Sequence, residues 1–218
     1  MTGRPLTRAD AYENARPDVQ ALVPRHARRI LDVGCAAGAL GAALKARQDV
    51  EVVGIDADPE YARLARERLD RVVEGDVETV DLDALGRFDC LVVADVLEHL
   101  RDPWATLRAL AERLEPGATA VVSLPNVRRW DTVWTLLRRG VFPRAEVGTF
   151  DRTHLHWFTR ADALHMLETA GLRVERVDTH MRLRQWETRW DRRLAWLVGR
   201  PGHWLFAFQY VIAARRPG

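Results

Sequence analysis

The sequence predicts a doubly wound α/β fold, in which helices cover both faces of a largely parallel sheet. Short runs rich in β-branched residues alternate with segments of helical period throughout residues 1–125, the pattern of successive βαβ units. Prolines open several of the predicted helices and glycines follow them, at the positions where helix ends tolerate each residue. In sheets of this kind ligands bind beyond the carboxyl ends of the strands, so a site is expected in the loops that follow them.

The first half of the chain supplies five predicted strands and the helices between them. The strands are 29–33, 51–56, 71–73, 88–94 and 119–124. The helices are 39–46, one that begins at the Asp58-Pro59 pair, and 103–114. Pro116 and Gly117 predict a turn between the last of these helices and the strand that follows it.

The pattern changes after Pro125, where insertions interrupt the regular alternation. Residues 126–159 contain a predicted helix at 130–139, followed by a stretch punctuated by glycine and proline. That stretch is too long for an ordinary connection and is typical of a lid or binding loop. A helix is predicted at 161–170, capped by Thr159 and ended by Gly171, and strands are predicted at 172–177 and 205–213.

The composition indicates one globular domain without a membrane span. The chain has 218 residues, of which 47% are hydrophobic and 29% are charged, an ordinary balance for a folded domain. No apolar run approaches the roughly 18 residues that a transmembrane helix needs. Residues 1–18 are polar and carry no apolar signal-peptide core, so we expect a cytoplasmic protein. Cys35 and Cys90 lack metal-ligand spacing and are expected to be reduced, structural residues.

Charge is divided unevenly along the chain. Residues 1–125 carry 16 basic and 22 acidic side chains, whereas residues 126–218 carry 17 basic and 9 acidic ones. A basic second half suits an anionic substrate, a nucleic acid or a membrane surface, and it is equally explained as a solvated surface. Because the arginines are scattered rather than arranged in a stripe, we expect no nucleic-acid partner.

The strongest local signal is the run ILDVGCAAG at 30–38, where a strand ends in Gly34 and Gly38 follows four residues later. Glycines at these positions let the chain turn sharply into a helix whose amides face outward, so that a ligand can approach the backbone closely. Asp56 ends the next strand and is placed to accept both hydroxyl groups of an adenosine ribose. The alternative is that the glycines only make a tight turn and Asp56 caps a helix.

On these residues the sequence resembles the class I S-adenosylmethionine-dependent methyltransferases, in particular the branch with small-molecule O-methyltransferases and the methionine-biosynthesis protein W. The resemblance covers residues 10–215. LDVGCAAG matches the family's first motif, except that Ala36 stands where the family has its middle glycine. Its methyl group adds bulk where the backbone passes the cofactor, and it argues more strongly against a dinucleotide site, which needs that glycine for its pyrophosphate.

The resemblance implies a Rossmann-like, seven-stranded sheet with an antiparallel last strand. It implies S-adenosylmethionine as cosubstrate, and nothing in the spacing of histidines and cysteines asks for a metal. It also implies a single domain over 1–218, with an N-terminal helical cover at 1–27 and a cofactor-binding half at 28–125. Substrate-side insertions would then occupy 126–159 and 181–204.

The same resemblance implies which residues bind the cofactor. Asp56 would bind the ribose and Ala57 would lie beside the adenine. Asp76 and Val77, in EGDVE, match an adenine-binding pair, and Asp95, in VADVLEHL, would lie near the methionine end. For each acid the alternative role is a helix cap or a surface turn.

An N-terminal segment, YENARPD, resembles one that closes over the methionine moiety. Arg16 would pair there with the methionine carboxylate in a fork-like contact, and its alternative is an exposed arginine before a helix. The cofactor-binding set implied by the resemblance is Tyr12, Arg16, Asp32, Gly34, Cys35, Gly38, Asp56, Ala57, Asp76, Val77 and Asp95.

Histidines are the candidate catalytic bases. Methyl transfer is largely a matter of positioning, but a hydroxyl or ammonium acceptor also needs a base of near-neutral pKa. We favour His154, in DRTHLHWFT at the expected substrate mouth, and then His99, in LEHL at the predicted helix start after the fourth strand. His156 is a further candidate. For each histidine the alternative role is to hold a loop through hydrogen bonds, and His165 is expected to be structural.

Seven of the eight tryptophans follow Pro125. Trp130 and Trp134 are four residues apart and share a helix face. The role expected first for the tryptophans is packing against the sheet. The alternatives are lining a cavity for a flat acceptor, a dimer contact and a membrane-surface contact.

Together these features predict methyl transfer from S-adenosylmethionine to an oxygen or nitrogen of a small molecule, with aromatic and anionic acceptors as the candidates, in a protein that can form a homodimer. Two rival functions remain. One is a non-catalytic methyltransferase-like protein that supports a partner enzyme, and the other is a nicotinamide-dependent oxidoreductase, against which Ala36 argues.

Overall fold

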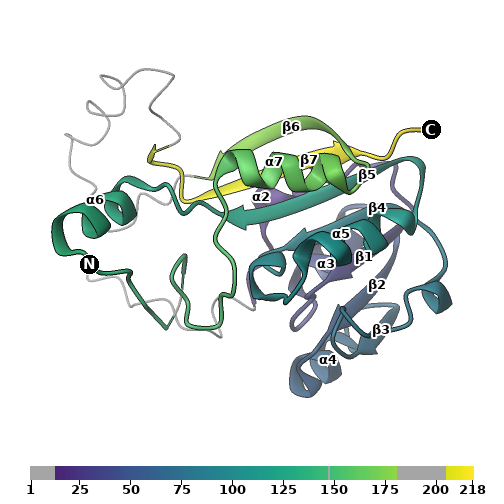
Figure 1. Cartoon of the computed structure of the whole chain (residues 1–218). Coiled ribbons are helices and arrows are strands. Elements are labelled where there is room, and N and C mark those ends of the chain that lie inside the picture. Colours follow the sequence, from purple (N-terminus) through teal and green to yellow (C-terminus); the bar gives the residue numbers. More distant parts are fainter. Residues whose placement is uncertain (1–12, 147, 181–204) are drawn as a thin grey trace.

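The computed structural model describes residues 13–146, 148–180 and 205–218. Seven strands form one sheet: β1 (Arg29–Val33), β2 (Glu51–Asp56), β3 (Arg71–Glu74), β4 (Phe88–Ala94), β5 (Leu114–Pro125), β6 (Arg173–His180) and β7 (Gln209–Arg215). The helices are α2 (Pro17–Gln20), α3 (Ala39–Arg47), α4 (Pro59–Ala65), α5 (Pro103–Glu112), α6 (Trp130–Arg139) and α7 (Arg160–Thr169), with 3₁₀ turns η1 (Asp83–Leu85) and η2 (Leu97–His99). Figure 1 shows the chain passing through them.

The strand order is β3-β2-β1-β4-β5-β7-β6. The first five strands pair in parallel, and β7 is antiparallel to both of its neighbours, β5 and β6. Six strands therefore run in one direction and the last runs against them. This arrangement confirms the predicted Rossmann-like sheet and its antiparallel last strand. The order reverses at β1 and β4, which places their carboxyl ends where such sheets bind ligands.

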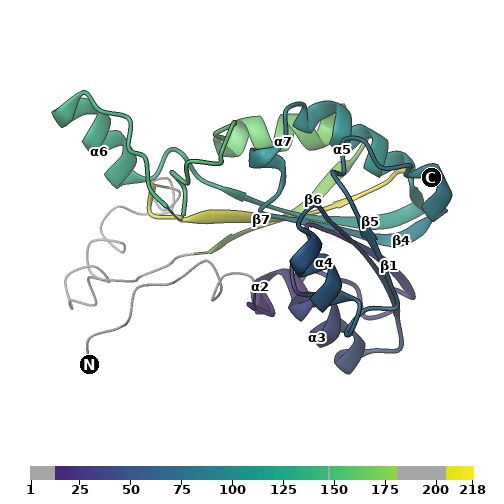
Figure 2. The ribbon, with the colours of Figure 1, turned by 90° about the horizontal axis from the view of Figure 1, so that it is seen from below.

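Each face of the sheet has its own core because successive strand residues point to opposite sides. Leu31, Val53 and Leu91 belong to the core shared with α5 and α7. Ile30 and Val52 belong to the core shared with α2, α3 and α4. Figure 2 shows these two helix layers on opposite sides of the sheet.

Local signals for the helix ends are confirmed. Asp58 caps α4 by accepting from the backbone amides of Glu60 and Tyr61 at 2.8 and 3.3 Å. Thr159 caps α7 in a reciprocal capping box with Asp162. These side chains satisfy amides that have no partner within their own helix.

Three predicted boundaries are wrong. The turn at Pro116 and Gly117 lies inside β5, whose pairing with β4 shifts register between Leu114 and Thr119. The reason is that Leu114 is fully buried and pairs with Phe88, so the strand already begins there. The last strand begins at Gln209 rather than at residue 205, because the carbonyls of Ala207 and Phe208 accept hydrogen bonds from Asn126 instead.

The third difference concerns the segment LEHL. It forms the separate turn η2 and is not part of the helix, and α5 begins at Pro103 as predicted, after Asp102, which caps it by accepting from the amide of Ala105 at 2.9 Å. Pro103 at the first helical position favours this start. His99 therefore lies in a connection between β4 and α5, at the carboxyl end of β4.

Helix α6 lies apart from the two helix layers in both views (Figures 1 and 2). Trp130 and Trp134 on this helix are 52% and 55% exposed, so for these two the structure does not bear out packing against the sheet. The other expected insertion, 181–204, lies outside the described residues. Among the helices that the structure describes, none combines the length and apolar character needed to cross a bilayer.

Candidate functional site

The turn between β1 and α3 is held by the neighbouring strand β2. Backbone amides of Gly34 and Cys35 donate to the carbonyl of Ile55 at 2.8 and 3.1 Å, and the amide of Ala36 donates to Asp56 Oδ2 at 2.7 Å. Gly34 has a φ of 68°, and a Cβ there would lie 2.3 Å from a methyl carbon of Val96. Glycine is therefore required at this position for both conformation and space.

Ala36 adopts the left-handed conformation, with a φ of 46°, and it lines the cavity described below. Left-handed backbone costs an alanine roughly 1–2 kcal/mol. The Ala36→Gly variant is expected to change stability by less than about 1 kcal/mol, because relief of this cost is offset by the greater freedom of glycine in the unfolded chain.

The same variant is expected to bind S-adenosylhomocysteine more tightly, because the methyl group no longer limits approach to the backbone. The expected gain in affinity is roughly two- to tenfold, where tenfold corresponds to about 1.4 kcal/mol. Calorimetric titration of both proteins measures the difference. An unchanged or weaker affinity would show that the methyl group is not an obstacle.

Two acidic residues lie at the same edge of the sheet beyond β2 and β3. Asp56 Oδ1 accepts from the amide of Asp58 at 2.9 Å while Oδ2 accepts from Ala36. Asp76 follows β3, and its Oδ1 accepts from the amide of Glu78 at 2.9 Å. Each carboxylate oxygen has two acceptor sites, so these contacts leave Asp56 able to bind further donors.

A cavity of about 460 Å³ opens beyond the carboxyl ends of β1 and β4. Seven predicted site residues line it: Arg16, Asp32, Gly34, Cys35, Asp95, His99 and His154. Gly38, Asp56, Ala57 and Asp76 are outside its lining. Val77 is buried in the α5-side core and lines a separate hollow of about 410 Å³ with Ala105 and Glu112. Tyr12 lies outside the described residues.

Arg16 spans the cavity wall from the N-terminal segment to the strand ends. Its guanidinium forms two hydrogen bonds with Asp18, at 3.1 and 3.0 Å, one with Ser123 Oγ at 2.9 Å and an ion pair with Asp95. Asp95, at a φ of 61°, also accepts from Ser123 and from Gln209 on β7. Burial lowers the pKa of Arg16, but Asp95 and Asp18 together outweigh burial and raise it. Arg16 is thus a charged group held at the cavity by acidic partners.

Asp32, on β1, is a buried carboxyl at the cavity wall. It is 2% exposed, and its Oδ2 has no hydrogen-bond partner among the described residues. Burial first, and then the nearby charge of Asp56, raise its pKa to about 7, while Arg16 opposes the rise. Because a pKa near 7 lies far above the ordinary value of 3.8, the folded protein retains this proton over a pH range in which the unfolded chain has lost it.

This difference predicts that the protein loses stability as pH rises from about 4 to 7, with no further loss from this group above that range. The loss is at most about 4 kcal/mol, from roughly 1.4 kcal/mol per pKa unit. Asp32→Asn is expected to lack this pH-dependent loss. Urea unfolding of both proteins at pH 5 and pH 8 measures it, and identical pH dependence in the two proteins would contradict the assignment.

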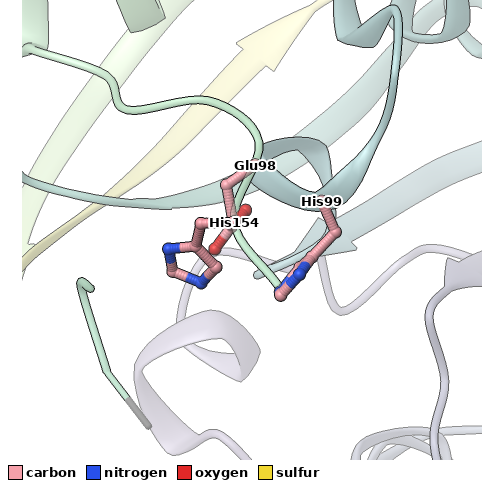
Figure 3. A group of neighbouring side chains, drawn as sticks. All are labelled: Glu98, His99 and His154. Carbon is pink, nitrogen blue, oxygen red and sulfur yellow. The ribbon is translucent and has the colours of Figure 1, made fainter. Parts of the chain in front are cut away.

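Glu98, His99 and His154 converge at one side of the cavity (Figure 3). Backbone amides of Leu155 and His156 donate to the carbonyl of Glu98 at 2.8 and 3.0 Å, which ties the segment after residue 150 to η2. The rings of His99 and His154 meet edge to face with centroids 4.6 Å apart. His99 is the most exposed of the three.

Burial changes the pKa of both inner groups. It raises the pKa of Glu98 well above the ordinary value, and the charge of Asp95 adds to the rise. Burial, followed by the neighbouring His99, lowers the pKa of His154. The lowered pKa favours the neutral imidazole of His154, whose Nδ1 lies 3.1 Å from the Thr149 carbonyl. Donation from Nδ1 to that carbonyl leaves Nε2 as the proton acceptor.

The remaining histidine candidates have other surroundings. His156 Nε2 lies 3.3 Å from the carbonyl of Arg101, and its ring packs edge to face against Trp104. His165 is exposed on α7, so the structural role expected for it is not seen. Sequence reasoning missed Glu98, which is 1% exposed and lines the cavity. It also missed Ser123 and Gln209, which hold Asp95 and carry no motif.

Comparison with known proteins gives a consistent result. The profile of the family described as Methyltransferase domain matches residues 7–177. A ubiquinone biosynthesis O-methyltransferase of Xanthomonas campestris pv. campestris is 39% identical over 114 residues, 50% of this chain and 47% of that protein. Another, from Xanthomonas axonopodis pv. citri, is 33% identical over 156 residues, 68% of this chain and 64% of that protein.

A solved S-adenosylmethionine-dependent methyltransferase from Mesorhizobium loti has the same fold. It superposes with a TM-score of 0.64 at 20% identity, over 93% of this chain and 98% of that one. The chain spans about half the length of the first curated relatives that it matches.

Proposed function

The chain belongs to the methyltransferase-domain family, and from this premise we propose that it transfers a methyl group from S-adenosylmethionine to a hydroxyl oxygen of a small molecule. The observation that carries the proposal is the cavity at the ends of β1 and β4, which has the backbone turn at Gly34, Cys35 and Ala36 on one side and Glu98, His99 and His154 on the other. Oxygen is favoured over nitrogen because the relatives in Xanthomonas are O-methyltransferases.

The residues at the carboxyl ends of β1 and β2 fit the cosubstrate. The turn holds its amides in place without a side chain at Gly34, and Asp56 retains acceptor capacity for ribose hydroxyls. Asp76 and Ala57 would lie on the adenine side, and Arg16 and Asp95 on the methionine side. When bound, the cosubstrate supplies a methyl group on a positively charged sulfur, and the carboxylate of Asp95 is suited to that charge.

The acceptor end is assigned to His154. Its neutral imidazole takes the proton of the acceptor hydroxyl through Nε2, while the Thr149 carbonyl fixes the tautomer. His99 assists from the more exposed side. Methyl transfer needs an in-line approach of the acceptor. The hydrogen bonds that join η2 to the segment after residue 150 therefore help to position the acceptor beside His154.

Formation of S-adenosylhomocysteine by the purified protein, with panels of hydroxyl and amine acceptors, tests the proposal. We expect turnover with hydroxyl acceptors and calorimetric binding of both S-adenosylmethionine and its demethylated product. Binding without turnover on any acceptor would favour the non-catalytic alternative. Preference for a reduced nicotinamide over S-adenosylmethionine would favour the oxidoreductase.

A further inference from the structure

Acidic groups outnumber basic ones among the described residues that line the cavity. The carboxyls are those of Asp18, Asp32, Asp95, Glu98 and Asp151, and the basic groups are Arg16, His99 and His154. Arg16 forms hydrogen bonds with Asp18 and an ion pair with Asp95, so these two carboxylates balance its charge. None of the described arginines that follow Pro125 lines the cavity. The basic second half of the chain therefore offers no arginine to an acceptor bound there.

Glu98 presents a polar atom without a partner to this cavity. The residue is 1% exposed, and Oε2 has no hydrogen-bond partner within the described part of the chain. A buried polar atom without a partner is costly, and nearly all such atoms in proteins are paired with a protein group or water. An acceptor that places a polar group against Glu98 would satisfy this oxygen.

Glu98 also lies next to the histidine proposed as the base. One carboxyl oxygen of Glu98 and one ring nitrogen of His154 lie within 4.8 Å of each other, and Figure 3 shows the two side chains together. The carbonyl of Glu98 accepts from the amides of Leu155 and His156, which holds η2 against the segment that carries His154. An acceptor whose reacting hydroxyl lies at His154 can therefore place a second polar group at Glu98.

The charges around Glu98 decide which polar groups it can bind. The charge of Asp95 adds to burial in raising the pKa of Glu98, and the charges of Asp151 and Asp95 also act on His154. A carboxylate or phosphate placed here would meet the same negative charges, and juxtaposed like charges oppose binding. An ammonium is attracted by them and favours the ionised form of Glu98. A hydroxyl can pair with either form, because it both donates and accepts.

We propose that Glu98 determines acceptor specificity. Its carboxyl binds a neutral or cationic hydrogen-bonding group of the acceptor, and the acidic lining excludes acceptors that carry an anionic group at this end of the cavity. The placement of the reacting hydroxyl at His154 rests on the proposed function, whereas the charge preference of the cavity does not.

Three phenols that differ in their terminal group test the proposal. Tyramine carries an ammonium, tyrosol a hydroxyl and 4-hydroxyphenylacetate a carboxylate. Calorimetry near neutral pH measures the affinity of each for the protein, with and without saturating S-adenosylhomocysteine. We expect tyramine and tyrosol to bind more tightly than 4-hydroxyphenylacetate by about tenfold or more.

Glu98→Gln keeps the size and hydrogen-bonding capacity of the side chain but removes its charge. It is expected to lower the affinity for tyramine by about tenfold and to change that for tyrosol by less than about threefold. Glu67→Gln is the matched control, because Glu67 is an exposed residue that pairs with Arg63 and does not line the cavity. It is expected to bind all three phenols as the unaltered protein does. Thermal unfolding of each variant establishes that it is folded.

Binding of 4-hydroxyphenylacetate as tight as that of tyramine or tyrosol would overturn the proposal. An unchanged affinity for tyramine in Glu98→Gln would also overturn it, as would the absence of binding by both tyramine and tyrosol. Titration with S-adenosylhomocysteine alone separates this proposal from the proposed function. Failure of that titration would contradict the proposed function, while the order of affinities among the three phenols would still decide the role of Glu98.

Discussion

Replacing His154 with alanine is expected to lower kcat for methyl transfer by a factor of about 10² to 10⁴, the usual contribution of a positioned acid or base. The imidazole is 6% exposed, is held by the Thr149 carbonyl and lines the cavity. Alanine leaves nothing at that place to take the proton. KM for S-adenosylmethionine is expected to change little, since His154 lies on the acceptor side. Initial rates at saturating acceptor measure both constants.

His165→Ala is the control for this experiment and is expected to keep full activity. A kcat for His154→Ala within about threefold of the unaltered enzyme would contradict a role in the chemical step. His99→Ala is expected to cause a smaller loss, because its ring is more exposed.

Replacing Asp56 with alanine is expected to weaken S-adenosylhomocysteine binding by about 100-fold, or roughly 3 kcal/mol, the value of one or two hydrogen bonds to a charged group. Two effects combine in this loss. The variant removes the acceptor proposed for the ribose, and it frees the amide of Ala36, which donates to Asp56 at 2.7 Å. The turn that faces the ligand is then less firmly held. Calorimetry gives the affinity directly.

Asp49→Ala is the matched control, since Asp49 is a surface residue whose carboxylate pairs only with the exposed Arg28 in the described chain. It is expected to leave the affinity unchanged. If Asp56→Ala binds the ligand as tightly as this control does, the carboxyl ends of β1 and β2 do not form the nucleoside site, and the proposed function loses its main support.

The fold was predictable because its signals are local. The strands β1, β2 and β4 have the predicted bounds, and the caps at Asp58 and Thr159 are where the sequence placed them. The wrong predictions concern element boundaries that are set by burial or by contacts between residues distant in the sequence. Leu114 enters the sheet because Phe88 lies opposite it, and β7 starts late because Asn126 takes the preceding carbonyls.

The site was predictable only in part. Residues at strand ends, such as Asp32 and Asp95, follow from the alternation of strands and helices. Glu98 and His154 are 56 positions apart, and nothing in the spacing of the sequence reveals that they meet. Sequence spacing detects functional groups only within one motif. Convergence of two segments through the Glu98 carbonyl is a property of the folded chain.

The position of β7 has a consequence for how the molecule assembles. β6 precedes β7 in the chain, yet among the described strands it pairs with β7 alone. During synthesis on the ribosome β6 therefore has no pairing partner until β7 has emerged, and the edge of β5 stays open for the same interval. Since Gln209 of β7 holds Asp95 and lines the cavity, the cavity is complete only when β7 has joined the sheet.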